Sequence, residues 1–139
     1  MAENSVPVEL NDDERRFLRA ALLDWGGPAN PTNELAVALG VRDAETLSAD
    51  TWALWKVIES GSDLPPEDWR RVLLAVEVVF ISDVVGSGLD WSVTSGFSDE
   101  DSIRILRGLQ RRLPRWRNSV QFSTKDGRVQ LADPDRPNA

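Results

Sequence analysis

The sequence has no cysteine, no histidine and no tyrosine among its 139 residues, and it has one methionine. Such a chain offers no thiolate nucleophile, no imidazole base and no Ser-His-Asp triad. It also lacks the side chains that most often bind zinc, haem iron and iron–sulfur clusters. These chemistries are excluded, and only a site built from carboxylates and hydroxyls, such as a magnesium site, stays open. We expect no catalytic residue, no bound metal and no cofactor.

Long apolar runs and a recognisable targeting signal are missing as well. Residues 1–10 are acidic and contain no apolar run of the kind found in secretory signals. The longest apolar stretch, residues 72–85, is too short to cross a bilayer and contains Glu77 and Asp83. The absence of cysteine is compatible with a reducing compartment. We therefore expect a cytoplasmic protein that does not enter a membrane.

Charge is divided unevenly along the chain, whose net charge is −7. Residues 1–101 hold 20 acidic and 7 basic side chains, whereas residues 102–139 hold 3 acidic and 9 basic ones. A basic end of this kind either binds a polyanion or neutralises the acidic part of its own domain. We favour neutralisation, because compact domains usually pair surfaces of opposite charge. The rest of the surface is then expected to be acidic.

Apolar residues recur at helical spacing in five segments, each bounded by residues that start or stop helices. Asparagine, aspartate and serine are good N-terminal caps, whereas glycine and proline end helices. The expected caps are Asn11, Asn30, Asp43 or Ser48, and Ser98, and the expected ends are marked by Gly26, Gly40, Gly61, Gly86 and Pro114.

The fourth segment, residues 66–85, is the most apolar of the five. Aliphatic side chains lie on most of its sides, and a helix of that kind occupies the middle of a bundle. Its length and its charged start favour a helix over a strand. The chain length suits one domain. We therefore predict a mainly α, single-domain, irregular or orthogonal bundle of about five helices around a buried central helix at residues 66–85.

The C-terminal part has a different pattern. Two runs that alternate apolar and polar residues flank Asp126-Gly127, and this is a recognised hairpin signal. We predict a small β-hairpin at residues 119–132 and a disordered tail at residues 133–139. The predicted domain is residues 1–132.

Asp83 is the first candidate site residue. On a helix through residues 66–85 it falls on the most apolar stripe, near the end where the helix dipole disfavours an anion. A carboxylate in that position must be paired, hydrogen-bonded or protonated. One interpretation is a functional carboxylate in a pocket. The other is a structural latch, in which Asp83 accepts hydrogen bonds from the backbone amides of residues 87–89 or from an arginine of the last helix. We favour the latch.

Residues 86–97 are rich in glycine, serine and threonine and are predicted to form a loop. The loop carries Asp90 and Trp91, and loops often hold contacts to ligands and partners. Together with Asp83, Asp90 would form a small-molecule or hydrolytic site. The alternative is an ordinary loop that Trp91 and Phe97 fix to the core, and both interpretations stay open.

Three arginines form a row on the last helix. Arg104, Arg107 and Arg111 fall within about 60° of one another on a helical wheel. Glu100 can pair with Arg104, but no acid of that helix stands at the favourable spacing from Arg107 or Arg111. Such a row suits the phosphates of a nucleic acid. We favour a solvated face instead, because the surrounding negative charge repels phosphate.

The function that these features favour is a non-catalytic protein-interaction or regulatory module, of the adaptor or immunity type, with self-association as one option. The six tryptophans support it, since aromatic side chains that are not buried mark interfaces. One alternative is a nucleic-acid-associated regulator that uses the arginine row. Another is a small-molecule or hydrolytic site around Asp83 and Asp90. Whether the protein is an enzyme stays open, with a non-catalytic role favoured.

Overall fold

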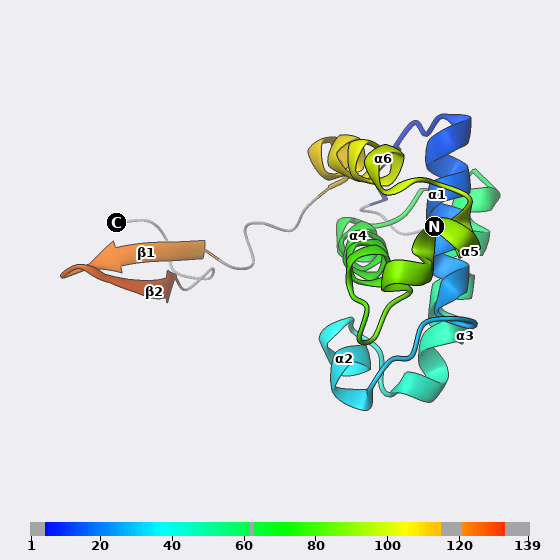
Figure 1. Cartoon of the computed structure of the whole chain (residues 1–139). Coiled ribbons are helices and arrows are strands. Elements are labelled where there is room, and N and C mark those ends of the chain that lie inside the picture. The colour runs from blue at the N-terminus through cyan, green and yellow to red at the C-terminus, as the bar shows by residue number, and fades with distance from the viewer. Residues whose placement is uncertain (1–4, 62, 115–120, 133–139) are drawn as a thin grey trace.

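The computed structural model describes residues 5–61, 63–114 and 121–132. Within these ranges, six α-helices and one short 3-10 helix form a bundle, and the predicted mainly α fold class is confirmed (Figure 1). The helices are α1 (Asp12–Asp24), α2 (Asn33–Ala38), α3 (Ala44–Glu59), α4 (Pro66–Ile81), η1 (Gly88–Asp90), α5 (Trp91–Ser95) and α6 (Asp99–Arg112).

Three long helices begin at the caps that the sequence indicates. The side chain of Asn11 accepts a hydrogen bond from the Glu14 amide at 2.8 Å, and the Glu14 carboxylate accepts one from the Asn11 amide at 2.9 Å. This reciprocal pair satisfies two amides that the first turn of α1 leaves open. Asp43 caps α3 and Ser98 caps α6. The Thr46 amide that bonds Asp43 holds the pKa of that carboxyl below its ordinary value.

The start of α2 lies further along the chain than predicted. Its cap is Thr32, whose hydroxyl accepts from the Leu35 amide at 3.1 Å, and the predicted cap Asn30 is wrong. Asn30 does not cap the helix because it takes part in a contact distant in sequence: its backbone N–H donates to the Val85 carbonyl at 2.9 Å. That bond holds residue 30 in the segment that leads into α2.

The core lies where α1 and α4 meet. Helix α1 contacts α3, α4, α5 and α6, while α4 contacts α1, α3 and α6, so the two helices share the centre of the bundle. The Phe17 ring packs edge-on against the Trp91 ring, with 5.4 Å between centroids. Fully buried valines of α4 complete this centre: Val72, Val76 and Val79.

Helix α4 ends at Ile81, four residues before the predicted end at residue 85. The chain turns back on the last turn of the helix, where the Ser87 amide donates to the Val79 carbonyl at 2.7 Å. The Gly86 amide donates to the Ser82 carbonyl at 3.0 Å. These bonds satisfy carbonyls that a helix end otherwise leaves open. Asp83 therefore lies in a turn, and its predicted position on the apolar stripe of the helix is wrong.

The predicted loop at residues 86–97 is mostly helical. It contains η1 and α5, and α5 ends at Gly96 with a left-handed backbone (φ 77°). The prediction of an irregular loop is wrong because the serines and threonines here bond locally and to the core. The Ser95 hydroxyl, for example, donates to the Trp91 carbonyl at 2.6 Å.

Two strands follow further along the chain. Strand β1 (Gln121–Lys125) pairs antiparallel with β2 (Arg128–Ala132). Asp126 and Gly127 form the turn with φ values of 53° and 74°, as a two-residue hairpin with the type I′ geometry requires. The first residues of the predicted hairpin, and residues 133–139, lie outside the described residues, and the single domain at 1–132 stays a prediction.

The fold predicts opposite effects for two glycine substitutions. A Cβ at Gly86 would lie 2.4 Å from the Val78 carbonyl oxygen, whereas a Cβ at Gly108, inside α6, meets nothing within 4 Å. We expect Gly86→Ala to lower the free energy of unfolding by roughly 1–3 kcal/mol through overpacking. Gly108→Ala should raise it by about 0.5–1 kcal/mol, because alanine suits a helix interior better.

Urea unfolding followed by circular dichroism measures both changes. Equal stability of Gly86→Ala and the unmodified protein would show that the turn after α4 does not pack as described.

Candidate functional site

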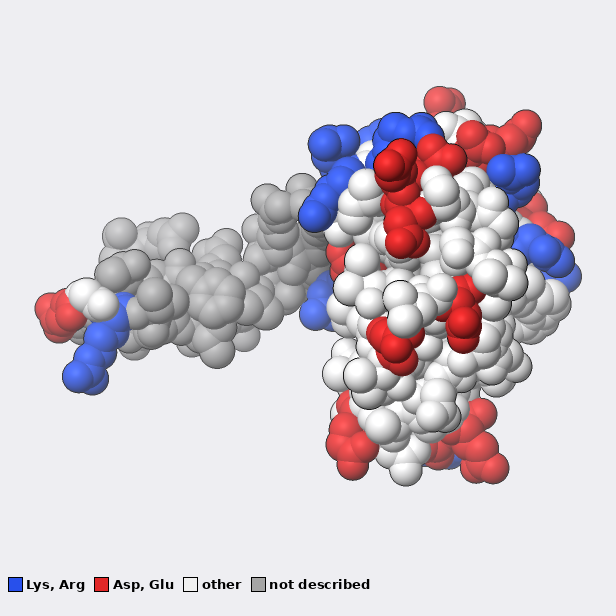
Figure 2. Space-filling view, in the orientation of Figure 1, with Lys and Arg blue, Asp and Glu red and all other residues white. Residues whose placement is uncertain are grey.

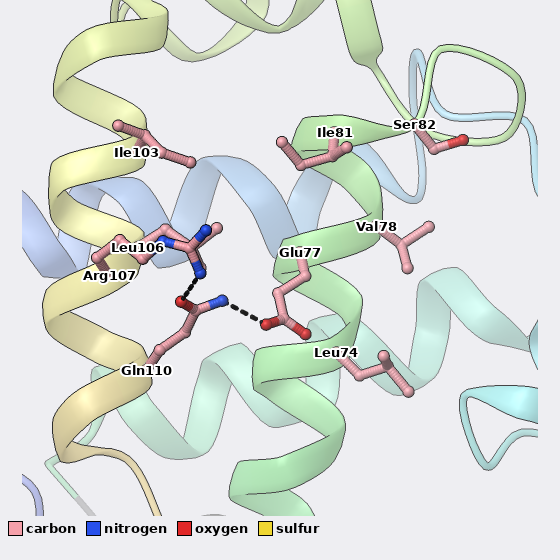
Figure 3. Close-up of a pocket in the computed structure, with 9 residues that line it drawn as sticks. All are labelled: Leu74, Glu77, Val78, Ile81, Ser82, Ile103, Leu106, Arg107 and Gln110. Atoms are coloured by element: carbon pink, nitrogen blue, oxygen red, sulfur yellow. Dashed lines mark hydrogen bonds between the residues drawn. The ribbon is translucent and has the colours of Figure 1, made fainter.

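An apolar groove of about 360 Å³ runs between α4 and α6. On α4 it is lined by positions 74, 78 and 81, which share one face of the helix because they are spaced by four and three residues. Figure 3 shows Ile81 of α4 and Ile103 of α6 directed toward one another across the groove. The residues that line it are Leu74, Glu77, Val78, Ile81, Ser82, Ile103, Leu106, Arg107 and Gln110.

A second hollow of about 360 Å³ continues the groove toward the turn after α4. It shares Ile81 and Ile103 with the groove and adds Leu89 of η1 and the carboxylates Asp83 and Asp99. The aliphatic side chains of the two hollows, apart from the buried Leu106, form one surface, here named the α4–α6 patch. Its members are Leu74, Val78, Ile81, Leu89 and Ile103.

The α4–α6 patch leaves large aliphatic side chains in water. Ile81 is 62 % exposed, Leu89 86 % and Ile103 39 %, whereas Val79, two residues from Ile81, is fully buried. Single exposed apolar residues are ordinary on protein surfaces. A group of them around a hollow, with a charged rim, is instead typical of a binding surface.

A chain of hydrogen bonds crosses the groove and joins the two helices. The Gln110 side-chain amide donates to the Glu77 carboxylate at 2.6 Å, and the Arg107 guanidinium donates to the Gln110 carbonyl at 2.7 Å (Figure 3). Glu77 and Gln110 are half-buried, so water competes with these bonds less than at a fully exposed site. These two hydrogen bonds hold the guanidinium of Arg107 at the rim of the groove.

The rim is acidic at one end of α6 and basic at the other. The first turn of α6 carries three acids, Asp99, Glu100 and Asp101, and its last turn carries Arg111 and Arg112. In Figure 2 the Lys and Arg side chains gather over the C-terminal end of α6. Charges of both signs reach the α4–α6 patch, since Asp99 of the first turn lines one hollow and Arg107, further along α6, lines the other.

The three arginines of the predicted row are exposed on α6, but they differ in their polar partners. Arg104 forms an ion pair with Asp101, so the predicted partner Glu100 is replaced by the acid one residue later. Arg107 lines the groove. Arg111 has no polar partner in the part of the chain that the structure describes.

One basic residue near this row pairs with an acid of the N-terminal part of the chain. Arg112 pairs with Glu14 of α1, and its guanidinium also donates to the Glu9 carbonyl at 2.9 Å. The Glu14 side chain is nearly buried, so this contact ties the end of α6 to the start of α1. One arginine of the basic C-terminal part thus contacts the acidic part of the chain, and the wider neutralisation stays a prediction.

Asp83 and Asp90 have different surroundings. Asp83 is exposed and accepts a hydrogen bond from the Leu89 amide at 2.9 Å, which is one of the two latch contacts expected for it. Asp90 is exposed at the start of α5 and makes no capping bond with its side chain. Of the two hollows described here, Asp83 lines one and Asp90 neither.

Of the two interpretations left open for this segment, the one in which Trp91 and Phe97 pack on the core agrees with the structure, and Trp91 is a core residue. Its side chain is fully buried, and the indole N–H donates to the Ser102 hydroxyl at 2.8 Å. The Ser102 hydroxyl in turn donates to the Ser98 carbonyl at 2.7 Å, so the Trp91 indole N–H and the Ser102 hydroxyl both have an acceptor. Trp91 offers no surface to a ligand or partner and instead holds α5 against α6.

A buried carboxylate escaped the sequence analysis. Asp24, at the end of α1, is 7 % exposed and accepts hydrogen bonds from the Ser87 and Thr94 hydroxyls, both at 2.7 Å. The two hydroxyls satisfy the carboxylate and fix the segment after α4 to α1. Its partners stand 63 and 70 residues away, and no local signal in the sequence indicates them.

Two further features are absent from the described ranges: a metal-binding cluster and a membrane-spanning helix. No cluster of three or more acidic side chains there is arranged to hold a metal ion. No helix there combines the length and the apolar character needed to cross a bilayer.

Comparison with known proteins does not identify a relative. The chain matches no protein family, and no significant similarity to a curated protein or to a solved structure was found. Function is therefore inferred from the α4–α6 patch itself.

The buried Trp91 contact predicts a loss of stability on Ser102→Ala. The substitution leaves the indole N–H buried without an acceptor, which should lower the free energy of unfolding by roughly 1–3 kcal/mol. Ser92→Ala, on the exposed side of α5, is the matched control and should change it by less than about 0.5 kcal/mol.

Chemical unfolding monitored by tryptophan fluorescence measures both. If Ser102→Ala is as stable as the control, Trp91 is not held in the way described, and its assignment to the core is contradicted.

Proposed function

We propose that this protein is a non-catalytic, cytoplasmic protein-interaction module that binds its partner through the α4–α6 patch. The observation that carries the proposal is the exposure of Ile81, at 62 %, in the middle of two adjoining apolar hollows. Water penalises apolar surface, and a contiguous apolar surface with a charged rim is typical of a site that another protein covers.

The composition of the surface supports a protein partner over a small molecule. An apolar centre surrounded by polar and charged groups is the usual anatomy of protein interfaces, and arginine is enriched in them. The patch also has the shape of a groove between two helices, which suits an amphipathic helix as its occupant. Small-molecule sites more often enclose most of the ligand surface.

The arginine row gives less support to nucleic-acid binding. Arg104 is already paired with Asp101, and Asp99 and Glu100 lie on the same helix. Phosphate contacts need uncompensated positive charge, and acids nearby weaken them. Arg107 and Arg111 are better explained as part of the charged rim of the α4–α6 patch.

Site-specific photo-crosslinking tests the proposal. A photoreactive residue in place of Ile81, in protein expressed in its native cells, should yield discrete adducts with a bound protein. The same residue in place of Val37 is the matched control, because Val37 is 63 % exposed on α2, away from the patch.

Combining the Ile81 probe with Ile103→Glu should reduce the adduct roughly tenfold, since a charge is then buried at the centre of the contact. Equal adduct yields from the Ile81 and Val37 probes would show that the patch is not the binding surface.

A further inference from the structure

The outward face of α6 carries an acid, an aliphatic residue and a base in one line. Asp99, Ile103 and Arg107 are spaced by four residues, so they share a stripe of the helix. All three line the hollows of the α4–α6 patch, with Ile103 in the middle. The Asp99 side chain forms no hydrogen bond or ion pair with another residue of the described ranges, and it lines the second hollow.

This stripe is complementary to itself when reversed. If two copies of α6 lie antiparallel with Ile103 on a two-fold axis, positions equally far from 103 on either side oppose each other. Asp99 of each copy then faces Arg107 of the other, and the two Ile103 side chains meet at the axis. A two-fold interface requires a surface that pairs with its own reversed copy in this way.

The opposite orientation lacks this match. In a parallel arrangement, Asp99 would face Asp99 and Arg107 would face Arg107, and like charges in contact suppress an association. The dipoles of two helices also favour antiparallel neighbours, because opposite ends then lie together. Both effects select the antiparallel pair.

From this we infer that the occupant of the α4–α6 patch is a second copy of this chain, with the two α6 helices antiparallel across Ile103. The inference rests on the proposed function and names the partner. Ile81 adjoins Ile103 in both hollows, so the second copy would cover it as well. Two copies then contribute four isoleucines to one apolar centre, between two Asp99–Arg107 pairs.

Sedimentation of the full chain over a range of concentrations gives the first test. We expect a species that approaches twice the 15.5 kDa of the chain as the concentration rises. Ile81→Glu should remain monomeric, whereas the matched control Val37→Glu should still dimerise. A protein that is monomeric throughout, or a dimer that survives Ile81→Glu, would overturn the inference.

Charge exchange tests the orientation. Arg107→Glu alone and Asp99→Arg alone each place like charges opposite one another in a homodimer, and each should weaken dimerisation at least roughly tenfold. In an equimolar mixture of the two variants, each new charge faces an opposite charge, and a one-to-one dimer should return. Circular dichroism of each variant controls for folding, and failure of the folded mixture to pair would contradict the antiparallel arrangement.

The absence of native cysteine allows a covalent test of the axis. Ile103→Cys should form a disulfide-linked dimer under mild oxidation, because the axis brings position 103 next to its own copy. Val37→Cys, the control, should not. Equal cross-linking of the two variants would show that Ile103 does not lie on a two-fold axis.

Failure of this inference and failure of the proposed function give different results. If the chain is monomeric but the photoreactive probe at Ile81 captures a different protein, the second copy is wrong and the interaction surface stands. If the chain is monomeric and the probe at Ile81 captures nothing beyond the Val37 control, both are wrong.

Discussion

The Ser87 amide donates a hydrogen bond to the Val79 carbonyl, and this contact folds the chain back onto the last turn of α4. The Ser87 hydroxyl donates to the buried carboxylate of Asp24, so the same residue also binds the returning segment to α1. The end of α4 at Ile81 is thereby fixed. Asp83 is placed in the turn, α5 is held against the core through Trp91, and Ile81 stays at the edge of the last turn of α4. The candidate surface depends on these two bonds of Ser87.

Helix α4 is apolar on more faces than its neighbours cover. Helices α1, α3 and α6 pack against it, yet the line through Leu74, Val78 and Ile81 faces the groove. Full burial of an isoleucine side chain stabilises by about 1.5–3 kcal/mol, and Ile81, which is 62 % exposed in the isolated chain, gains less than half of that. The fold alone does not use this part of the apolar surface of α4. An association that covers the groove would recover it, and the patch thus accounts for the apolar side chains of α4 that the core leaves exposed.

The local features of the fold follow from the sequence, whereas the site depends on contacts between distant segments. Asp43 and Ser98 were predictable as caps because a cap and its amides lie within three residues of each other. The end of α4 was not, because it depends on Ser87 and Asp24. Asp83 was placed wrongly for the same reason. Periodicity identifies α4 as apolar on most sides, but it does not show which of those sides a neighbouring helix covers, and so Ile81 was missed.

The uneven charge of the chain bears on how two copies would meet. Each copy carries a net charge of −7, so two copies repel each other. Salt screens this repulsion between charges that are more than about 8–10 Å apart. At shorter distances the arrangement of individual charges determines whether two surfaces attract or repel. Asp99 and Arg107 place a negative and a positive charge on one helix, and together they add nothing to the net charge. Ion pairs at a rim contribute more to orientation than to affinity. The affinity must therefore come from the isoleucines between them, and the charged stripe determines which way round the second copy binds.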